Sequence, residues 1–404
     1  MRIRNSGCSR RLFFRAATVP QKIISTRVSN ATLSWGLPGI VLGCLFLAQA
    51  YGQADTGSAV VSESGEQFFQ STDFASVEKI DIHVHIHCDD LDFVAMAKRD
   101  HFSFLNMAVW SNPDPAVNVE KHRTVFLQYE GNQDRIVPVV SFPLENWDDP
   151  DWGEQTIAYL KTQFDRGAVG VKIWKNIGMT LRDRNGHLIM VDDPKLDPVI
   201  RYIQEQDRVL LGHLGEPKNC WLPLEEMTTN NDRNYFRKNP QYHMHLHPEL
   251  PSYEAQIDAR DRMLAKHPKL KFVGCHLASL EWSVDEIAEF LDRFPNAVVG
   301  VAARMGQIQY QSQRDADRVT DFFRRYQDRV LYGTDTGIGT GDNMVEEYAS
   351  TRAKWVRDWN YFSTNKSIKV PELDDPVIGL RLPKSVIQKI YYENAKRVFD
   401  QSWK

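Results

Sequence analysis

Short apolar runs alternate regularly with amphipathic stretches along most of this chain, and this alternation limits the folds open to it. The strand-like runs are Lys79–His85, Phe102–Trp110, Arg135–Phe142, Ala168–Trp174, Arg208–Gly215, Lys271–Ala278, Ala297–Arg304 and Val330–Gly337. Helical patterns lie between or after them, at Asp151–Arg166, Leu196–Gln206, Tyr253–His267, Ser283–Phe294, Asp315–Gln327 and Lys384–Phe399. Eight strand–helix units predict an α/β fold with parallel strands, and the length of 404 residues favours closure into a (β/α)8 TIM barrel. The alternative is a doubly wound open sheet, but no glycine-rich phosphate loop follows the first strand.

Two connections are longer than a barrel needs. One runs from Glu216 to Ser252 after the fifth strand, and the other from Gly341 to Pro383 after the eighth. Long loops in a compact domain are usually functional or disordered. Because both follow strands, we expect both loops at the C-terminal rim of the barrel, where the active sites of this fold lie.

The first 54 residues differ from the rest in composition. Basic residues occur here with no acid before Asp55, and an apolar run from Leu33 to Ala50 follows them, ending in Ala-Gln-Ala. This order is typical of an export signal with a small-residue cleavage site. We therefore interpret residues 1–54 as an export signal, residues 55–77 as a polar linker and residues 78–404 as the barrel. The expected location is the periplasm or the extracellular space, with membrane attachment only if the segment is uncleaved or lipidated.

The rest of the composition is that of an ordinary globular protein, with 42% hydrophobic and 25% charged residues. The net charge of −4 and the lack of a long basic run beyond the N-terminus argue against nucleic acid as a partner. Three cysteines lie beyond the export segment, which is not a disulfide framework. We expect a small-molecule substrate as the partner, and the sequence leaves a homo-oligomer open.

The first strand carries histidines at alternate positions in the stretch Lys79–Cys88, KIDIHVHIHC. In an extended strand, alternate side chains share a face, so the isoleucines and Val84 are expected on one face and Asp81, His83, His85 and His87 on the other. Two imidazoles separated by one residue can converge on one cation at a strand end. Alone, this pair could equally be polar residues of an edge strand.

Further candidate ligands end other strands. His213 ends the fifth, His276 the sixth and Asp335 the eighth. Because the carboxyl ends of parallel strands meet at one rim, we expect these side chains to lie near His83 and His85. The sequence therefore predicts a divalent metal site. Imidazole and carboxylate ligands favour Zn2+, with Mn2+ or Fe2+ as alternatives.

The chain resembles the amidohydrolase-related family of TIM-barrel metal-dependent hydrolases from about Ile80 to Phe399. The resemblance is carried by DIHVH, GVKIW, GHLGEP, VGCHLAS, YGTDTG and YYENAKRVF. It implies that His83, His85, His213 and Asp335 bind a divalent ion, with His276 beside it. In that setting Asp335 is the expected general base and acid, and His276 is expected to stabilise the attacked oxygen or to hold the substrate.

The expected activity is hydrolysis of an amide, ester or lactone bond by a metal-activated water. Relatives with the same set of site residues also carry out non-hydrolytic decarboxylation of aromatic or enoic acids, and this reaction is the alternative. A second alternative is a binder of metal or ligand without turnover. The substrate is not determined by these residues.

Two cationic side chains at strand ends have several interpretations. Lys172 is expected to face the barrel interior, where it could be a carbamylated bridge between two metals, a charged partner of substrate or acid, or a structural ion pair. The resemblance is to a branch that mostly uses one metal. Arg304, at the end of the seventh strand, could hold a substrate carboxylate or form a salt bridge at the rim.

Overall fold

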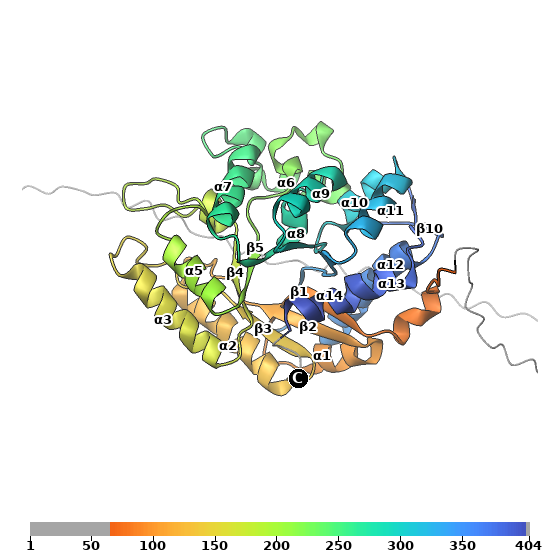
Figure 1. Ribbon diagram of the computed structural model, residues 1–404, viewed down its shortest axis with the longest axis horizontal. Helices are drawn as coiled ribbons and strands as arrows, with labels where there is room; N and C mark the ends of the chain where they lie inside the picture. Colours follow the sequence, from red (N-terminus) through yellow and green to blue (C-terminus); the bar gives the residue numbers. More distant parts are fainter. Residues whose placement is uncertain (1–64, 401–404) are drawn as a thin grey trace, which may run out of the picture. The chain divides into compact units, whose positions relative to one another are not determined.

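The computed structural model describes residues 65–400, and a curled parallel sheet forms the centre of this part (Figure 1). Its strand order is β8-β7-β6-β5-β4-β3-β2-β1-β9. The strands are β1 Lys79–His87, β2 Phe102–Met107, β3 Ile136–Val140, β4 Gly170–Ile173, β5 Val209–Gly212, β6 Lys271–Gly274, β7 Ala297–Gly300, β8 Val330–Leu331 and β9 Thr336–Gly339. The predicted α/β fold is confirmed as TIM-barrel-like.

The two end strands of this sheet belong to one chain segment. β8 pairs with β7, and five residues later β9 begins to pair with β1. Between them, the Tyr332 carbonyl accepts a hydrogen bond from Ile82 N at 3.0 Å, and Asp335 N donates to the His83 carbonyl at 2.8 Å. The eighth predicted run therefore contacts both ends of the sheet, and this brings Asp335 beside the histidines of β1.

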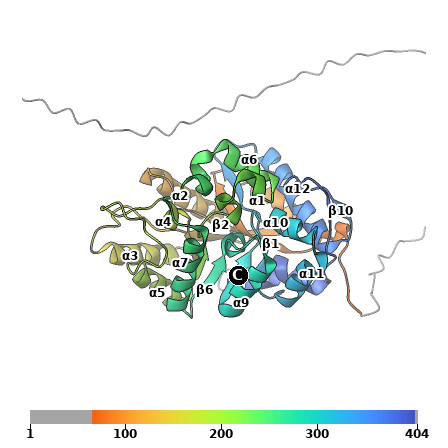
Figure 2. The ribbon, with the colours of Figure 1, turned by 90° about the horizontal axis from the view of Figure 1, so that it is seen from above.

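Helices cover the outside of the sheet, and Figure 2 shows the same arrangement from above. Several begin with an N-cap that their sequence supplies: the Ser252 side chain accepts from Ala255 N, and the Ser283 side chain accepts from Glu286 N. The helices are α1 Asp92–Ala97, α2 Pro115–Gly131, α3 Trp152–Asp165, α4 Asn176–Met179, α5 Asp197–Glu205, α6 Asn230–Lys238, α7 Tyr253–Lys266, α8 Cys275–Ala278, α9 Val284–Arg293, α10 Met305–Ser312, α11 Ala316–Arg325, α12 Met344–Ser363, α13 Lys384–Gln388 and α14 Asn394–Val398.

The two long connections are largely structured, unlike the long loops that we expected. The connection after β5 holds α6 and several single helical turns, and the connection after the eighth run holds α12 and the antiparallel pair β10 Ser367–Ile368 and β11 Val377–Ile378. The 20 residues of α12 are helical because their aromatic residues recur at helical spacing and become buried. Trp355, for example, stacks on Phe102 with ring centroids 3.9 Å apart.

The described end of the predicted linker packs on the domain. Phe69 and Phe74 are buried against Trp359, with ring centroids 5.1 and 6.1 Å apart. Glu66 pairs with Arg324 at 2.8 Å. Residues 66–74 are therefore held to α11 and α12 by apolar and charged contacts.

The predicted export signal, residues 1–54, lies outside the described residues. Among the helices of residues 65–400, none is long and apolar enough to cross a membrane. Cys88, Cys220 and Cys275 are buried and unlinked.

Candidate metal centre

A bulge in β1 arranges the face that carries the histidines. The pairing of β1 with β2 shifts register between Asp81 and Val84. Ile80 and Ile82 therefore pack in the interior core with residues such as Val273, whereas Val84 packs in the outer core under the helices. The expectation that these apolar residues share one face is wrong, because a bulge interrupts the alternation of a strand.

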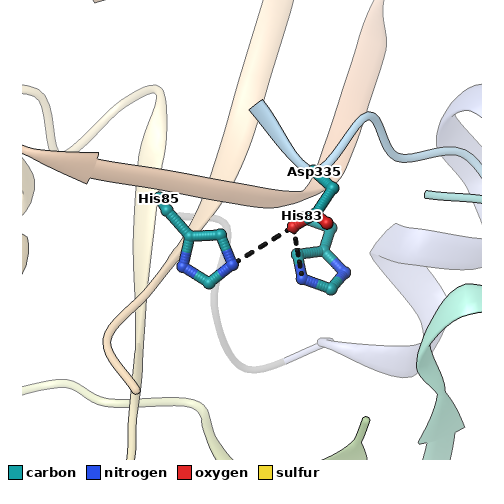
Figure 3. Close-up of side chains that lie close together, drawn as sticks. All are labelled: His83, His85 and Asp335. Atoms are coloured by element: carbon teal, nitrogen blue, oxygen red, sulfur yellow. Dashed lines mark ion pairs between the residues drawn. The ribbon is translucent and has the colours of Figure 1, made fainter. Parts of the chain in front are cut away.

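His83, His85 and Asp335 lie together at the rim (Figure 3). The Asp335 Oδ1 atom is 3.2 Å from His83 Nε2 and 3.3 Å from His85 Nε2. One ligand atom from each of the three residues lies within 4.8 Å of the others. The prediction that Asp335 approaches both histidines of the first strand is thus met by the geometry.

The hydrogen bonds of these rings show that the cluster fits a cation. His85 Nδ1 donates to the Met107 carbonyl at 2.9 Å, so in the neutral ring Nε2 presents a lone pair to the Asp335 carboxylate. His83 Nε2 faces the same carboxylate oxygen. Acceptor atoms that face one another repel, and a divalent cation bound by all three removes that repulsion.

His213 and His276 form a second pair behind this cluster. His276 Nδ1 donates to the Ala302 carbonyl at 2.8 Å, and its Nε2 lies 3.1 Å from His213 Nδ1. Because Ala302 O can only accept, the neutral His276 must accept from His213 Nδ1–H. His213 Nε2 then carries a lone pair, and this buried nitrogen has no hydrogen-bond partner.

This pair bears on two of the predicted roles. The unpartnered Nε2 suits the predicted ligand role of His213, although His213 is not part of the three-residue group. His276 orients His213 in this arrangement, since its Nε2 is engaged by that ring. The structure thus adds a positioning role that the sequence does not indicate.

The backbone around His276 is strained. His276, Leu277, Ala278 and Ser279 all have φ between 56° and 59°, and Asp335 has φ of 62°. Left-handed backbone costs a non-glycine residue about 1–2 kcal/mol. Such strain persists where the surrounding structure imposes it and is typical of functional sites. Here the turn carries the His276 ring toward His213.

Burial favours the neutral form of three histidines of the site, His83, His213 and His276. Burial lowers the pKa of His83 and of His213 well below the ordinary value, and lowers that of His276 to about 3. Burial raises the pKa of Asp335, and only positive charge on the side of His83 and His85 lowers it well below the ordinary value; with neutral rings, the divalent cation that the three residues would hold supplies that charge. Neutral imidazole and ionised carboxylate are the forms that bind metal.

Asp81 lies on the other side of β1 from these ligands, contrary to expectation. Its carboxylate accepts hydrogen bonds from His83 N, from the backbone and hydroxyl of Thr334, and from Trp355 Nε1. Burial raises its pKa to about 6, and these hydrogen bonds oppose the rise. Asp81 therefore fastens β1 to the segment that carries Asp335 and positions the site from outside.

Lys172 lies in the interior beside the cluster, as predicted. Its Nζ is 2.9 Å from Cys275 Sγ and 3.4 Å from His83 Nε2, and the side chain is fully buried. Within residues 65–400, no carboxylate forms a salt bridge with it. Sequence reasoning did not find the Cys275 contact, because Lys172 lies on β4 and Cys275 follows β6, and β5 separates these two strands.

Arg304 is buried at the end of the seventh predicted run. One guanidinium nitrogen donates to the Ala303 carbonyl at 2.9 Å, while Nε has no partner. Burial raises the pKa of the neighbouring Glu281 to about 7, and the charge of Arg304 opposes this rise. Of the two roles considered for Arg304, the rim salt bridge has no carboxylate partner among the described residues, and the grip on a substrate carboxylate stays a prediction.

A TIM-barrel-like sheet with a His–His–Asp cluster at the carboxyl ends of its strands is the arrangement of a TIM-barrel protein with a metal site. This chain belongs to the amidohydrolase family, whose sequence model, described as Amidohydrolase, matches residues 80–401. The predicted family is thereby confirmed. Members typically use a divalent metal, in agreement with the cluster.

Solved structures with a similar chain include two enzymes. The 2,6-dihydroxybenzoate decarboxylase from Rhizobium is 15% identical, with a TM-score of 0.49, over 80% of this chain and 99% of that one. The 4-oxalomesaconate hydratase from Rhodopseudomonas palustris is 13% identical, with a TM-score of 0.44, over 80% of this chain and 96% of that one. No curated protein matches this chain.

Proposed function

We propose that this protein is an exported metal-dependent hydrolase that cleaves an amide, ester or lactone bond of a small molecule. The observation that carries the proposal is the convergence of three acceptor atoms, one each from His83, His85 and Asp335, at the carboxyl ends of the strands. Membership of the amidohydrolase family supports the same assignment.

The residues that would hold the ion are His83, His85 and Asp335, with His213 as the fourth ligand through its unpartnered Nε2. Zinc suits this donor set, with manganese or iron as alternatives. When bound, such an ion lowers the pKa of a coordinated water to about 7 and polarises a carbonyl oxygen.

The chain's own residues would divide the remaining work. Asp335 would accept the proton of the attacking water and return it to the leaving group, because its second carboxylate oxygen is not engaged by His83 or His85. His276 would hold His213 in the tautomer that presents Nε2. Lys172 would add positive charge beside His83, where charge on the attacked oxygen develops.

A small-molecule substrate is supported by a cavity at the same rim. It measures about 280 Å³ and lies between the end of β4 and the connection after β5. Apolar and aromatic walls dominate it, including Trp174, Tyr235 and Met244. Lys175 and Glu216 form an ion pair and both line this cavity. Glu216 lies three residues after His213 in the sequence.

The proposal is tested by metal analysis of the purified protein and a panel of lactone, ester, amide and carboxylate substrates. We expect a bound divalent ion and hydrolysis of at least one of the first three classes. Release of carbon dioxide from the carboxylates, without hydrolysis, would instead assign a decarboxylase. Bound metal without turnover of any substrate class would instead assign a protein that binds metal or ligand without catalysis.

We further propose that export removes residues up to about Ala50. The basic residues, the apolar run and the final Ala-Gln-Ala follow the order of a cleaved signal. N-terminal sequencing of the protein recovered from an exporting bacterial host should begin near Tyr51. A product that still begins at Met1 and stays in the cytoplasm would contradict export.

A further inference from the structure

A second cavity, of about 180 Å³, is lined in part by Asp335. It lies between α10, which follows β7, and α12, which follows β9, and Asn231 of α6 contributes to its wall; Figure 2 shows these helices at neighbouring positions. The function proposed above gives this cavity no role. Its walls are more polar than those of the cavity beside β4.

Two cationic side chains of α12 line this cavity. Lys354 Nζ is 3.4 Å from the Thr334 carbonyl, one residue before Asp335. Arg357, one turn later on the same helix, is 3.9 Å from Glu372, a separation too long for a direct hydrogen bond. Both cations therefore keep donors available toward the cavity, because each side chain has more donor hydrogens than these contacts use.

Two buried polar side chains in the same wall lack a partner for one atom. Gln309 is 1% exposed and its Nε2 has no hydrogen-bond partner. Asp358 is 2% exposed; its Oδ2 accepts from the Tyr332 hydroxyl at 2.9 Å, but its Oδ1 has no partner. Buried polar atoms are usually hydrogen-bonded in folded proteins, so these two atoms indicate a surface that faces a ligand. Gln309 Nε2 is a donor that suits an anion, and Asp358 can donate to an anion only in its protonated form.

The charges of the wall favour a single negative charge. Burial raises the pKa of Asp358 to about 7, although Arg357, the Tyr332 hydroxyl and Lys354 oppose the rise. Lys354 and Arg357 then face two acids, Glu372 and a partly ionised Asp358, so the two cations slightly outweigh the acids of the wall apart from Asp335, whose charge a bound metal ion would neutralise. A monoanion suits this wall better than a dianion, which would meet the repulsion of Glu372.

We propose that this cavity binds a carboxylate group of the substrate, held by Lys354 and Arg357, while the bond to be cleaved lies at the His83–His85–Asp335 cluster. The inference rests on the proposed function, since it assigns the substrate class of that site: small molecules that carry a carboxylate apart from the scissile bond. Arg357 can grip a carboxylate through two parallel hydrogen bonds, and Lys354 adds a second charge.

Titration calorimetry of the full-length metal-loaded protein with benzoate and its neutral isostere benzamide tests this assignment. We expect benzoate to bind at least about tenfold more tightly than benzamide, because each charge-assisted hydrogen bond is worth about tenfold or more in affinity. Lys354→Met and Arg357→Met should each weaken benzoate about tenfold, without changing benzamide binding or metal content. Arg357→Lys should recover part of the loss.

A matched control is Lys369→Met, which removes one positive charge from an exposed position of the same connection, outside the cavity. It should leave benzoate affinity unchanged. Equal benzoate affinity in the wild type, Lys354→Met and Arg357→Met would overturn the assignment, as would tighter binding of inorganic phosphate than of benzoate.

The same titration in the variant that lacks both His83 and His85 separates this proposal from the hydrolase proposal. Benzoate held by the cavity should still bind there and should still depend on Lys354. If the protein hydrolyses nothing but shows this dependence, the carboxylate site stands and the hydrolase is refuted. If it hydrolyses substrates but benzoate binding ignores both cations, the carboxylate site is refuted and the hydrolase stands.

Discussion

Replacing His83 and His85 together by alanine is expected to empty the metal centre and abolish turnover. The change removes two of the three acceptor atoms that converge at the rim and leaves Asp335 without facing imidazoles. A single carboxylate with His213 does not provide the three or four ligands of a catalytic zinc site. Metal content by elemental analysis, measured with activity on the same preparation, checks this.

The matched control replaces His187 and His245, two histidines at exposed positions that are not part of the cluster. It should keep both metal and activity. Because His83 is fully buried, thermal unfolding must show that the double variant folds, and His85→Ala alone, at a half-buried position, provides a milder version. An unchanged metal content in a folded double variant would refute the assigned ligands.

Much of this site could be predicted because it depends on strand ends. His83, His85, His213, His276 and Asp335 all follow apolar runs, and parallel strands bring their carboxyl ends to one rim whatever the loops do. The positions of the strand ends do not depend on side-chain contacts, so the apolar pattern locates the cluster but not the contacts within it.

The bulge in β1 is a feature that the pattern could not supply. Strict alternation predicts Asp81 beside His83, whereas the register shift sends Asp81 toward Trp355 and Thr334. A bulge adds a residue to one strand without any marker in that strand's own apolar pattern. Its position depends on the partner strand β2, which the local sequence of β1 does not reveal.

The second cavity escaped prediction for a related reason. Its cations, Lys354 and Arg357, lie in a connection interpreted as a long loop, where charged residues indicate only solvent exposure. Once residues 344–363 are helical, Trp355 and Trp359 turn inward on one face, and the neighbouring face carries Lys354 and Arg357 to the strand ends. The positions of Lys354 and Arg357 could therefore not be predicted without knowing that residues 344–363 are helical.

Replacing Asp335 by asparagine is expected to lower turnover by about 10²-fold or more while metal remains at least partly bound. Asparagine keeps the shape and one oxygen ligand, but it cannot accept the proton of the attacking water. Rates must therefore be compared at matched metal content. Near-normal turnover in metal-loaded Asp335→Asn would contradict the general-base role.

His276→Asn provides the comparison that separates the two reactions. In a hydrolase, His276 acts through His213, so its loss should disturb metal affinity and spare more of the chemical step than Asp335→Asn does. In a decarboxylase, Asp335 would mainly hold metal, and His276 would be the proton donor to the product carbon. The order of the two losses at equal metal loading then reverses. Because His276 Nε2 accepts from His213 in this arrangement, donation to a product carbon would require that contact to break, and the geometry therefore favours the hydrolytic order.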